Sequence, residues 1–449
     1  MKRKIYDQLL DWKNNRQGEV ALLIEGARRI GKSYIVEEFA KNEYESYILI
    51  DFNKAEPRVK RWFMDYMEDL DTFFEMLQQH YHVKLIPRKS LIIFDEVQLY
   101  PRARAAIKYL VADRRFDYLE TGSLISIKKN VKSIVIPSEE RPIQMYPMDF
   151  EEFLWAMGNE TLMPFLQKQF ETGKPMNELH REVMDMFRRY MMVGGMPQAV
   201  EKYVQTRDIE QVDAVKRDIL AIYRNDIRKY AGRLAMKVES IFDEIPSQLM
   251  RNERKFRLAD LKTDARMRDY ETAFMWLSDA KIVNCCYNTT APNIGLKLNM
   301  DRTTLKCYMV DTGLLISHAF DEKQLVSNEL YRKLLMDKLE VNAGMLIENI
   351  VAQMLAAAGH KLYFYSNPDN EDAENRMEID FLIRKDKVTS RHNIIPLEAK
   401  SSSGYKTVSL NKCVRKFGEF VTLPTVLHCS DARTEEGIRY LPLYMTPLL

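Results

Sequence analysis

A glycine-rich segment at residues 26–33 has the composition and spacing of a phosphate-binding loop. It reads Gly-Ala-Arg-Arg-Ile-Gly-Lys-Ser, which matches the pattern G-x-x-x-x-G-K-[ST]. In such a loop the glycines let backbone N–H groups close around phosphate oxygens, and the following helix adds its positive end. The lysine reaches the β- and γ-phosphates, where it also aids catalysis, and the serine hydroxyl ligates Mg²⁺. We therefore predict that ATP or ADP is bound by Gly26, Ala27, Arg28, Arg29, Ile30, Gly31, Lys32, Ser33 and Tyr34.

Two adjacent acids end an apolar run at residues 91–96, which reads Leu-Ile-Ile-Phe-Asp-Glu. Neighbouring carboxylates repel each other, so they are useful mainly where a cation and a water molecule need them. We expect Asp95 to hold Mg²⁺, directly or through water, and Glu96 to orient and deprotonate the attacking water. An ordinary strand end would also explain the pair by itself. Because the phosphate loop precedes it, the pair indicates hydrolysis of the bound nucleotide.

A third segment, at residues 118–123, ends in Thr121, Gly122 and Ser123. Hydroxyl groups placed between the loop and the two acids would sense the γ-phosphate. A strand followed by a glycine turn explains the same residues equally well. We include Thr121 and Ser123 among the nucleotide-binding residues with both interpretations open.

A second set of acids lies in the C-terminal part of the chain. Residues 377–383 alternate in polarity, which places Asp380 and the acid two residues before it on one face of a strand. A further strand pattern at residues 394–400 ends in Glu398 and Lys400, again on one face. If the two strands are neighbours, Asp380, Glu398 and Lys400 come together.

This second set has the composition of a metal-dependent site for cleaving phosphodiesters. Two carboxylates would hold Mg²⁺, and the lysine would position or activate water and offset charge on the phosphate. We assign catalysis to Asp380, Glu398 and Lys400, and metal binding to Asp380, Glu398 and Glu348, which lies on a predicted helix upstream. The short pattern [DE]-x-K is common, and it occurs again at residues 253–255. A solvated sheet face with an acid–lysine pair is therefore the alternative.

Residues 251–270 carry an excess of positive charge. Seven side chains are basic and four are acidic. Arg266 and Arg268 lie at the start of a predicted helix, where a DNA-binding helix meets base edges or phosphates. DNA is therefore a candidate partner, although a protein-binding surface or a solvated face fits the same charges. The basic residues are Arg251, Arg254, Lys255, Arg257, Lys262, Arg266 and Arg268.

The elements that must position the loop and the first acids alternate between strand and helix patterns. Apolar runs predict strands at residues 20–24, 47–50, 91–94 and 118–120, and periodic segments predict helices at residues 34–40 and 70–79. This alternation is typical of an α/β fold with a parallel sheet covered on both faces.

Strand patterns are missing from residues 149–230, where the periodicity predicts helices. Helices and two short strands, at residues 281–287 and 294–298, then follow in the order of a winged helix-turn-helix, with a further strand at 305–310. A polar helical linker is expected at 319–340. The remaining chain predicts a second α/β unit, with helices at 344–358 and 410–417 and strands at 361–365, 377–383, 394–399 and 425–428.

Composition sets limits on the class of protein. The 449 residues are 46% hydrophobic and 29% charged, which suits about three folded domains. The net charge of +2 by itself indicates neither a nucleic-acid nor an acidic partner. The five cysteines lack a C-x-x-C pair, which argues against a zinc site or a disulfide framework and favours the cytoplasm. No apolar run reaches the ~18 residues of a membrane span, and no secretory signal pattern is present, so we expect no membrane partner.

Taken together, these motifs resemble those of prokaryotic AAA-type P-loop ATPases that carry a C-terminal domain of unknown function similar to PD-(D/E)xK nucleases. Residues 146–153 and the Gly-Gly-Met-Pro segment at 194–197 extend the match. The resemblance implies that Pro197 packs against the adenine. It also matches Arg141 to a transition-state arginine acting within one subunit or on a neighbour, which makes a homo-oligomer a candidate. Glu140 replaces the usual preceding glycine, which favours a surface arginine instead.

The resemblance implies four domains: a P-loop ATPase core at residues 1–148, a helical lid at 149–233, a winged helix at 234–318, and a restriction-endonuclease-like α/β domain at 319–449. Our leading hypothesis is a Mg²⁺-dependent ATPase whose nucleotide state switches the winged helix and the nuclease-like module, with DNA as a candidate target. One alternative is an ATP-regulated, metal-dependent DNA nuclease. The other is a nucleotide-dependent module that binds a partner and cleaves nothing.

Overall fold

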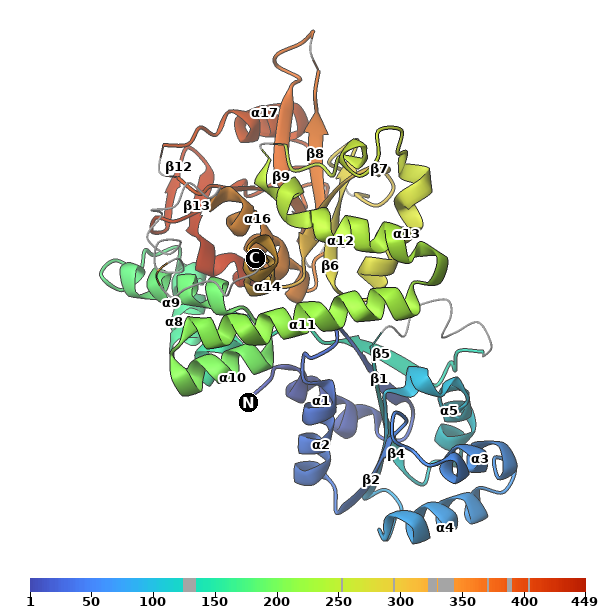
Figure 1. Cartoon of the computed structure of the whole chain (residues 1–449). Coiled ribbons are helices and arrows are strands. Elements are labelled where there is room, and N and C mark those ends of the chain that lie inside the picture. The colour runs from blue at the N-terminus through green and yellow to red at the C-terminus, as the bar shows by residue number, and fades with distance from the viewer. Residues whose placement is uncertain are drawn as a thin grey trace. The chain divides into compact units, whose positions relative to one another are not determined.

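The computed structural model describes residues 1–123, 135–251, 253–293, 295–321, 329, 343–369, 371–385, 390–402 and 404–449. Most of the linker expected at 319–340 lies outside these residues. The described chain forms two compact units: Met1–Pro147 with Asp279–Lys281, and Met148–Ser278 with Ile282–Leu449. Each unit has its own sheet (Figure 1).

The first unit is built on a five-stranded, wholly parallel sheet in the order β2-β3-β4-β1-β5. Its strands are β1 (Ala21–Glu25), β2 (Ser46–Asp51), β3 (Ser90–Asp95), β4 (Asp117–Gly122) and β5 (Glu140–Gln144). Every residue of β3 and β4 is buried, as expected for central parallel strands covered on both faces. The first four strands confirm the predicted α/β fold to within two residues. The edge strand β5 was missed because its sequence, Glu-Arg-Pro-Ile-Gln, has no apolar run.

Helices lie on both sides of this sheet, with α1 and α2 on one side and α3, α4 and α5 on the other (Figure 1). The main apolar core lies between the sheet and the second group, where Trp62 and Phe74 pack with Ile92 and Phe94. Asp69 begins α4 by accepting a hydrogen bond from the Thr72 N–H. The helices are α1 (Ile5–Arg16), α2 (Lys32–Glu43), α3 (Pro57–Asp65), α4 (Leu70–Tyr81) and α5 (Pro101–Asp113), with a short 3₁₀ turn η1 (Val97–Leu99) after β3.

The second unit begins with helices only, as the periodicity predicted. Asp149 and Glu152 form a reciprocal capping box that starts the first of them. The helices are α7 (Phe150–Ala156), α8 (Leu162–Thr172), α9 (Leu179–Val193), α10 (Pro197–Thr206), α11 (Ile209–Tyr230) and α12 (Ala235–Met250). They are followed by α13 (Met267–Asp279) and, further along the chain, by α14 (Thr312–Ala319), α16 (Ala343–Ala357) and α17 (Val408–Phe417). Among the described residues, none of the helices has the length and apolar character needed to cross a membrane.

An eight-stranded mixed sheet occupies the rest of this unit, in the order β12-β13-β11-β10-β9-β8-β6-β7. The antiparallel hairpin β6–β7 continues the C-terminal sheet because β6 pairs in parallel with β8. The sheet therefore crosses the boundary that we placed after residue 318. The strands are β6 (Val283–Thr289), β7 (Met300–Met309), β8 (Tyr363–Asn367), β9 (Met377–Arg384), β10 (Ile394–Ala399), β11 (Thr425–His428), β12 (Arg433–Glu435) and β13 (Ile438–Pro442).

The prediction of a strand at residues 294–298 was wrong. Residues 295–299 form a turn, and the partner of β6 is the later strand β7, which contains most of the segment expected at 305–310. Asn293 explains the turn: its side-chain oxygen accepts from the Gly295 N–H at 3.0 Å and from the Asn299 amide at 2.9 Å. Asparagine commonly stabilises turns through such local bonds, and this effect outweighed the short apolar pattern.

Candidate functional site

The predicted phosphate loop lies between the end of β1 and the start of α2. Gly31 has a φ of 91° and caps α2 in the left-handed region, where glycine is favoured. Gly26 is required for space, because a Cβ there would lie 2.3 Å from the Met145 carbonyl oxygen. The two glycines of the motif are therefore required for different reasons: Gly31 for its backbone conformation and Gly26 for the space beside it. The side chains of Arg28, Arg29 and Tyr34 are exposed.

Lys32 is buried and turns back onto its own loop. Its Nζ donates to the carbonyl oxygens of Gly26 at 3.0 Å and Ala27 at 2.8 Å. Burial lowers the pKa of Lys32 to about 8, while Glu96 and Asp95 act to raise it. A buried ammonium held by neutral carbonyl groups fits a loop that receives its counter-charge from a phosphate.

Asp95 lies at the end of β3, and two hydroxyl groups converge on one of its oxygens. Ser33 Oγ donates to Asp95 Oδ1 at 2.8 Å, and Thr121 Oγ1 donates to the same atom. Burial raises the pKa of Asp95, whereas the Thr121 and Ser33 hydrogen bonds lower it. The structure thus brings together the two predicted Mg²⁺ ligands, Ser33 and Asp95, as the hard oxygen donors that this ion prefers.

Glu96 follows Asp95 in a left-handed backbone conformation, with a φ of 55°. Its N–H donates to Thr121 Oγ1 at 3.3 Å, and its Oε2 accepts from Gln98 Nε2 at 2.5 Å. Thr121 therefore contacts the Asp95 carboxylate and the Glu96 backbone, and its role in sensing the γ-phosphate stays a prediction. Gln98 was missed by sequence reasoning, because neither its type nor its spacing marked it. Ser123 is buried just after β4.

Arg3 is a second residue that sequence reasoning missed. One guanidinium nitrogen donates to the Ile30 carbonyl oxygen at 2.7 Å, and the other donates to the Tyr146 carbonyl oxygen at 2.6 Å. The side chain is only 6% exposed. Arg3 therefore fastens the phosphate loop to the segment after β5. A basic residue near the N-terminus is usually solvated, so nothing in the sequence indicated this contact.

The Gly-Gly-Met-Pro segment lies between α9 and α10, with Pro197 as the first residue of α10. Gly195 packs so closely against Met148 that a Cβ would lie 2.1 Å from the Met148 carbonyl oxygen. The Gly195 N–H donates to Asp311 Oδ2 at 2.5 Å, and Asp311 Oδ1 caps α14 by accepting from the Leu314 N–H at 2.8 Å. Asp311 thus connects the glycine segment to α14, a role that the sequence did not suggest.

In the second unit, β9 and β10 are antiparallel neighbours, which is the condition on which the predicted meeting of Asp380, Glu398 and Lys400 depended. Asp380 Oδ2 accepts from the Ala399 N–H at 3.0 Å, next to Glu398. Lys400 Nζ lies 2.7 Å from Glu398 Oε2. Burial raises the pKa of Glu398 to about 7, and Lys400 opposes this change. Asp380, Glu398 and Lys400 therefore do come together, at the junction of the two strands.

Glu348, on α16, is buried and belongs to the same cluster, but its partners are basic residues that we had not assigned to it. Arg254 forms an ion pair with Glu348 Oε1, and Lys306 Nζ lies 3.6 Å from Glu348 Oε2. Tyr308 also donates its hydroxyl to Oε2, at 2.9 Å. Across the described residues, no group of three or more His, Cys, Asp or Glu side chains is arranged to hold a metal ion.

The basic segment at residues 251–270 is largely neutralised within the chain. Five of its seven basic side chains form ion pairs, one of them between Arg254 and Glu348 in the acid cluster. The other four pairs are Arg251–Asp260 at 2.9 Å, Lys255–Glu378 at 3.7 Å, Arg257–Glu253 at 3.2 Å and Arg268–Asp269 at 3.9 Å. Most of the positive charge that suggested DNA thus has a partner in the fold.

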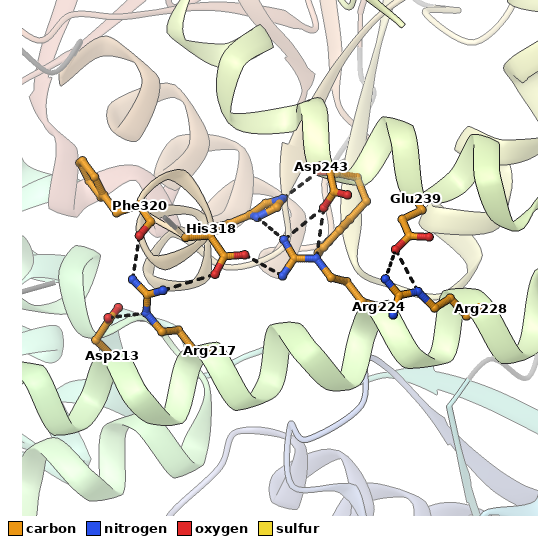
Figure 2. A network of polar contacts seen from close by, with 10 residues as sticks. Asp213, Arg217, Arg224, Arg228, Glu239, Asp243, His318 and Phe320 are labelled. Atoms are coloured by element: carbon orange, nitrogen blue, oxygen red, sulfur yellow. Dashed lines mark hydrogen bonds and ion pairs between the residues drawn. The ribbon is translucent and has the colours of Figure 1, made fainter. Parts of the chain in front are cut away.

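Helix α11 carries three arginines that form ion pairs within the same unit, one with an acid of α11 itself and two with acids of α12 (Figure 2). Arg217 pairs with Asp213 at 2.8 Å, Arg224 with Asp243 at 3.1 Å, and Arg228 with Glu239 at 2.5 Å. Arg217 and Arg224 also reach Asp321, and Arg224 contacts the imidazole of His318. These arginines join α11 to α12 and α14, which is a structural task.

Comparison with known families divides the chain into three matched segments. Residues 19–154 match an AAA domain, residues 184–324 match a domain of unknown function (DUF8612), and residues 343–445 match another domain of unknown function (DUF4143). No curated protein matches the sequence. The AAA match contains the phosphate loop, Asp95, Glu96 and Thr121, so residues 19–154 form an AAA-type P-loop domain.

Several solved structures are similar over much of the chain. The Walker-type ATPase PABY2304 of Pyrococcus abyssi is 14% identical, with a TM-score of 0.39 over 71% of this chain and 95% of that one. The Aeropyrum pernix ORC1 protein, solved in complex with DNA, is 12% identical, with a TM-score of 0.29 over 72% and 93%. Cdc6p from Pyrobaculum aerophilum is 13% identical, with a TM-score of 0.24 over 76% and 96%. Likeness at these TM-scores supports no conclusion about this chain.

Proposed function

We propose that this chain binds ATP with Mg²⁺, hydrolyses the β–γ bond, and uses the nucleotide state as a switch for its C-terminal unit. The observation that carries the proposal is the convergence of Ser33, Asp95 and Thr121 beside the loop that holds Lys32. The match of residues 19–154 to an AAA domain supports it.

Each residue of the site has a separate task in this proposal. The loop N–H groups bind the phosphates, and the Lys32 ammonium exchanges its carbonyl partners for phosphate oxygens. Ser33 and Asp95 would hold Mg²⁺, which neutralises charge on the transferred phosphoryl group. Glu96 accepts a proton from the attacking water, and Gln98 and Thr121 orient Glu96 for this step.

Two substitutions test this assignment against a matched control. Glu96→Gln should bind ATP at near-parent affinity and hydrolyse it at least ~100-fold more slowly, because a general base contributes about 10²–10⁴-fold. Lys32→Ala should abolish nucleotide binding. Lys41→Ala, at the exposed end of the same helix, should match the parent in both measurements. Binding is measured with a fluorescent ATP analogue and hydrolysis by phosphate release. Parent-rate hydrolysis by Glu96→Gln would show that another group is the base.

The output of the switch lies, in this proposal, in the second unit, made of a helical lid, a winged helix and a C-terminal α/β domain. Pro197 is the proposed adenine contact. Arg141 is exposed on the edge strand β5, where a neighbouring copy in a homo-oligomer could use it. DNA is the candidate target of the winged helix. The internal ion pairs of residues 251–270 favour a second candidate instead, in which the unit binds a partner protein according to the nucleotide state.

A further inference from the structure

The acid cluster of the second unit contains a buried lysine at its centre. Lys306, on β7, is 1% exposed. Its Nζ lies 2.9 Å from Glu378 Oε1, 3.6 Å from Asp380 Oδ1 and 3.6 Å from Glu348 Oε2. The same ammonium lies 5.1 Å from the centroid of the Phe364 ring. Three carboxylates from α16 and β9 thus converge on one cation that the chain itself supplies.

The other charges of the cluster are also paired. Arg254 binds the second oxygen of Glu348, Lys400 lies 2.7 Å from Glu398, and Lys255 lies 3.7 Å from Glu378 Oε2. Counted over the described residues, four acids face four basic side chains. Because a buried charge is costly without a partner, these pairs explain how so many acids fold together.

Three carboxylate oxygens within 3.6 Å of the Lys306 Nζ stabilise the charged ammonium form of this side chain. A divalent ion held by Asp380 and Glu348 would need carboxylates that this ammonium already contacts, and two cations so close together would repel each other. The arrangement therefore does not fit the Mg²⁺ ion that we had predicted for Asp380, Glu398 and Glu348.

We propose that the Lys306 ammonium is the resident cation of this cluster and holds Glu348, Glu378 and Asp380 together in place of a divalent metal ion. The C-terminal unit then assembles without metal and has no metal-dependent site for cleaving phosphodiesters. The two basic residues, Arg254 and Lys306, lie before α16 in the chain, whereas the three acids lie on α16 and β9. The cluster therefore works as a clamp that joins the β6–β7 hairpin region to α16 and β9. This inference does not depend on the proposed ATPase activity.

Mn²⁺ binding without nucleotide tests the proposal on the full chain. Asp95→Asn serves as the background, so that the site in the first unit contributes nothing. This protein should bind no Mn²⁺ at micromolar concentrations by electron paramagnetic resonance titration. Adding Lys306→Gln should create one Mn²⁺ site. Relative to the Asp95→Asn protein, Mn²⁺ affinity should rise at least about tenfold, which corresponds to ~1.4 kcal/mol. Adding Lys255→Gln, at the edge of the cluster, should create none.

Two results would overturn the proposal. One is a Mn²⁺ site in the Asp95→Asn protein that disappears in Asp95→Asn/Asp380→Asn. The other is a folded Lys306→Gln protein, checked by circular dichroism, that gains no site. If Lys306→Gln does not fold, the first comparison still decides. Cleavage of duplex DNA in the presence of Mg²⁺ is the second readout. Neither the parent nor Asp380→Ala should cleave the DNA. Cleavage by the parent but not by Asp380→Ala would show that the cluster is a nuclease site and would overturn the proposal.

Discussion

Two of the acid clusters in the described residues, one in each unit, differ in what neutralises them. In the first unit, Asp95 accepts hydrogen bonds from two neutral hydroxyls, Ser33 and Thr121, while Lys32 donates to loop carbonyls. In the second unit, Asp380 lies 3.6 Å from the buried ammonium of Lys306. The first arrangement orients a carboxylate and leaves its charge available to an exchangeable cation. The second arrangement uses that charge to hold the fold together.

The physical difference is one of desolvation. Hydroxyl groups stabilise a buried carboxylate without cancelling its charge, and each such bond contributes about 1.5–3 kcal/mol. A buried ion pair cancels the charge, and removing one partner costs ~3–5 kcal/mol because the other is left uncompensated. Acids that look alike in a sequence can therefore serve catalysis in one place and stability in another.

The largest expected effect is a loss of ATP hydrolysis in one cluster and of stability in the other when one acid of each cluster is replaced by asparagine. Asp95→Asn should reduce Mg²⁺-dependent ATP hydrolysis by more than ~100-fold and lower the free energy of unfolding by no more than ~1.5–3 kcal/mol, because the hydroxyl hydrogen bonds are weakened but no ion pair is broken. Asp380→Asn should leave ATP hydrolysis within about twofold of the parent and lower the free energy of unfolding by ~3–5 kcal/mol, because the buried ammonium of Lys306 loses a carboxylate partner. Steady-state phosphate release and urea denaturation measure the two effects. Loss of ATPase activity in Asp380→Asn with the stability unchanged would break the comparison.

A smaller effect should follow from changing the hydroxyl that joins both acids of the first cluster. Thr121→Val removes the donor to Asp95 and the acceptor for the Glu96 N–H at nearly constant shape. We expect kcat to fall about tenfold, as the loss of one hydrogen bond of ~1–2 kcal/mol implies, while KM for ATP changes little. Thr121→Ser keeps the hydroxyl and should retain most of the rate. Equal rates in both variants and the parent would show that the contact has no part in hydrolysis.

The smallest effect concerns the arginine network of α11, which provides a purely structural reference (Figure 2). His318 Nε2 donates to the Phe242 carbonyl oxygen at 2.9 Å, so Nδ1 is left to accept from Arg224 at 3.3 Å. Burial lowers the pKa of His318 and Arg224 lowers it further, while the hydrogen bond to Phe242 and the charges of Asp243 and Asp321 oppose this. Folding therefore favours the neutral imidazole.

Its contribution to stability should be complete above the ordinary histidine pKa of about 6.5 and decline as pH falls below it, because the unfolded chain then binds the proton more readily. His318→Gln should reduce the loss of unfolding free energy between about pH 7 and pH 5, and should leave ATP hydrolysis unchanged at pH 7. Urea denaturation at the two pH values measures the slope. An equal slope in the variant and the parent would mean that folding does not change the pKa of His318.

Local sequence signals were reliable where a residue acts through its neighbours in the chain. The apolar run of β3 and the glycines of the phosphate loop indicated the first site, because a strand end and a tight loop are determined within a few residues. The turn at residues 295–299 was mistaken for a strand because a few apolar residues imitate one. β5 was missed because its edge position, and not its composition, makes it a strand.

By itself, the sequence determined the phosphate loop, the acids of β3 and the strands that carry Asp380 and Glu398, since each depends on local patterns, whereas the pairing of those two strands came from the structure. Only the tertiary structure decided which charges meet. Arg3 reaches Tyr146, Asp311 reaches Gly195, and Lys306 enters a carboxylate cluster whose members lie on α16 and β9. Such partners are distant in the chain, and a lysine on a strand has no periodicity that predicts which acids it will neutralise.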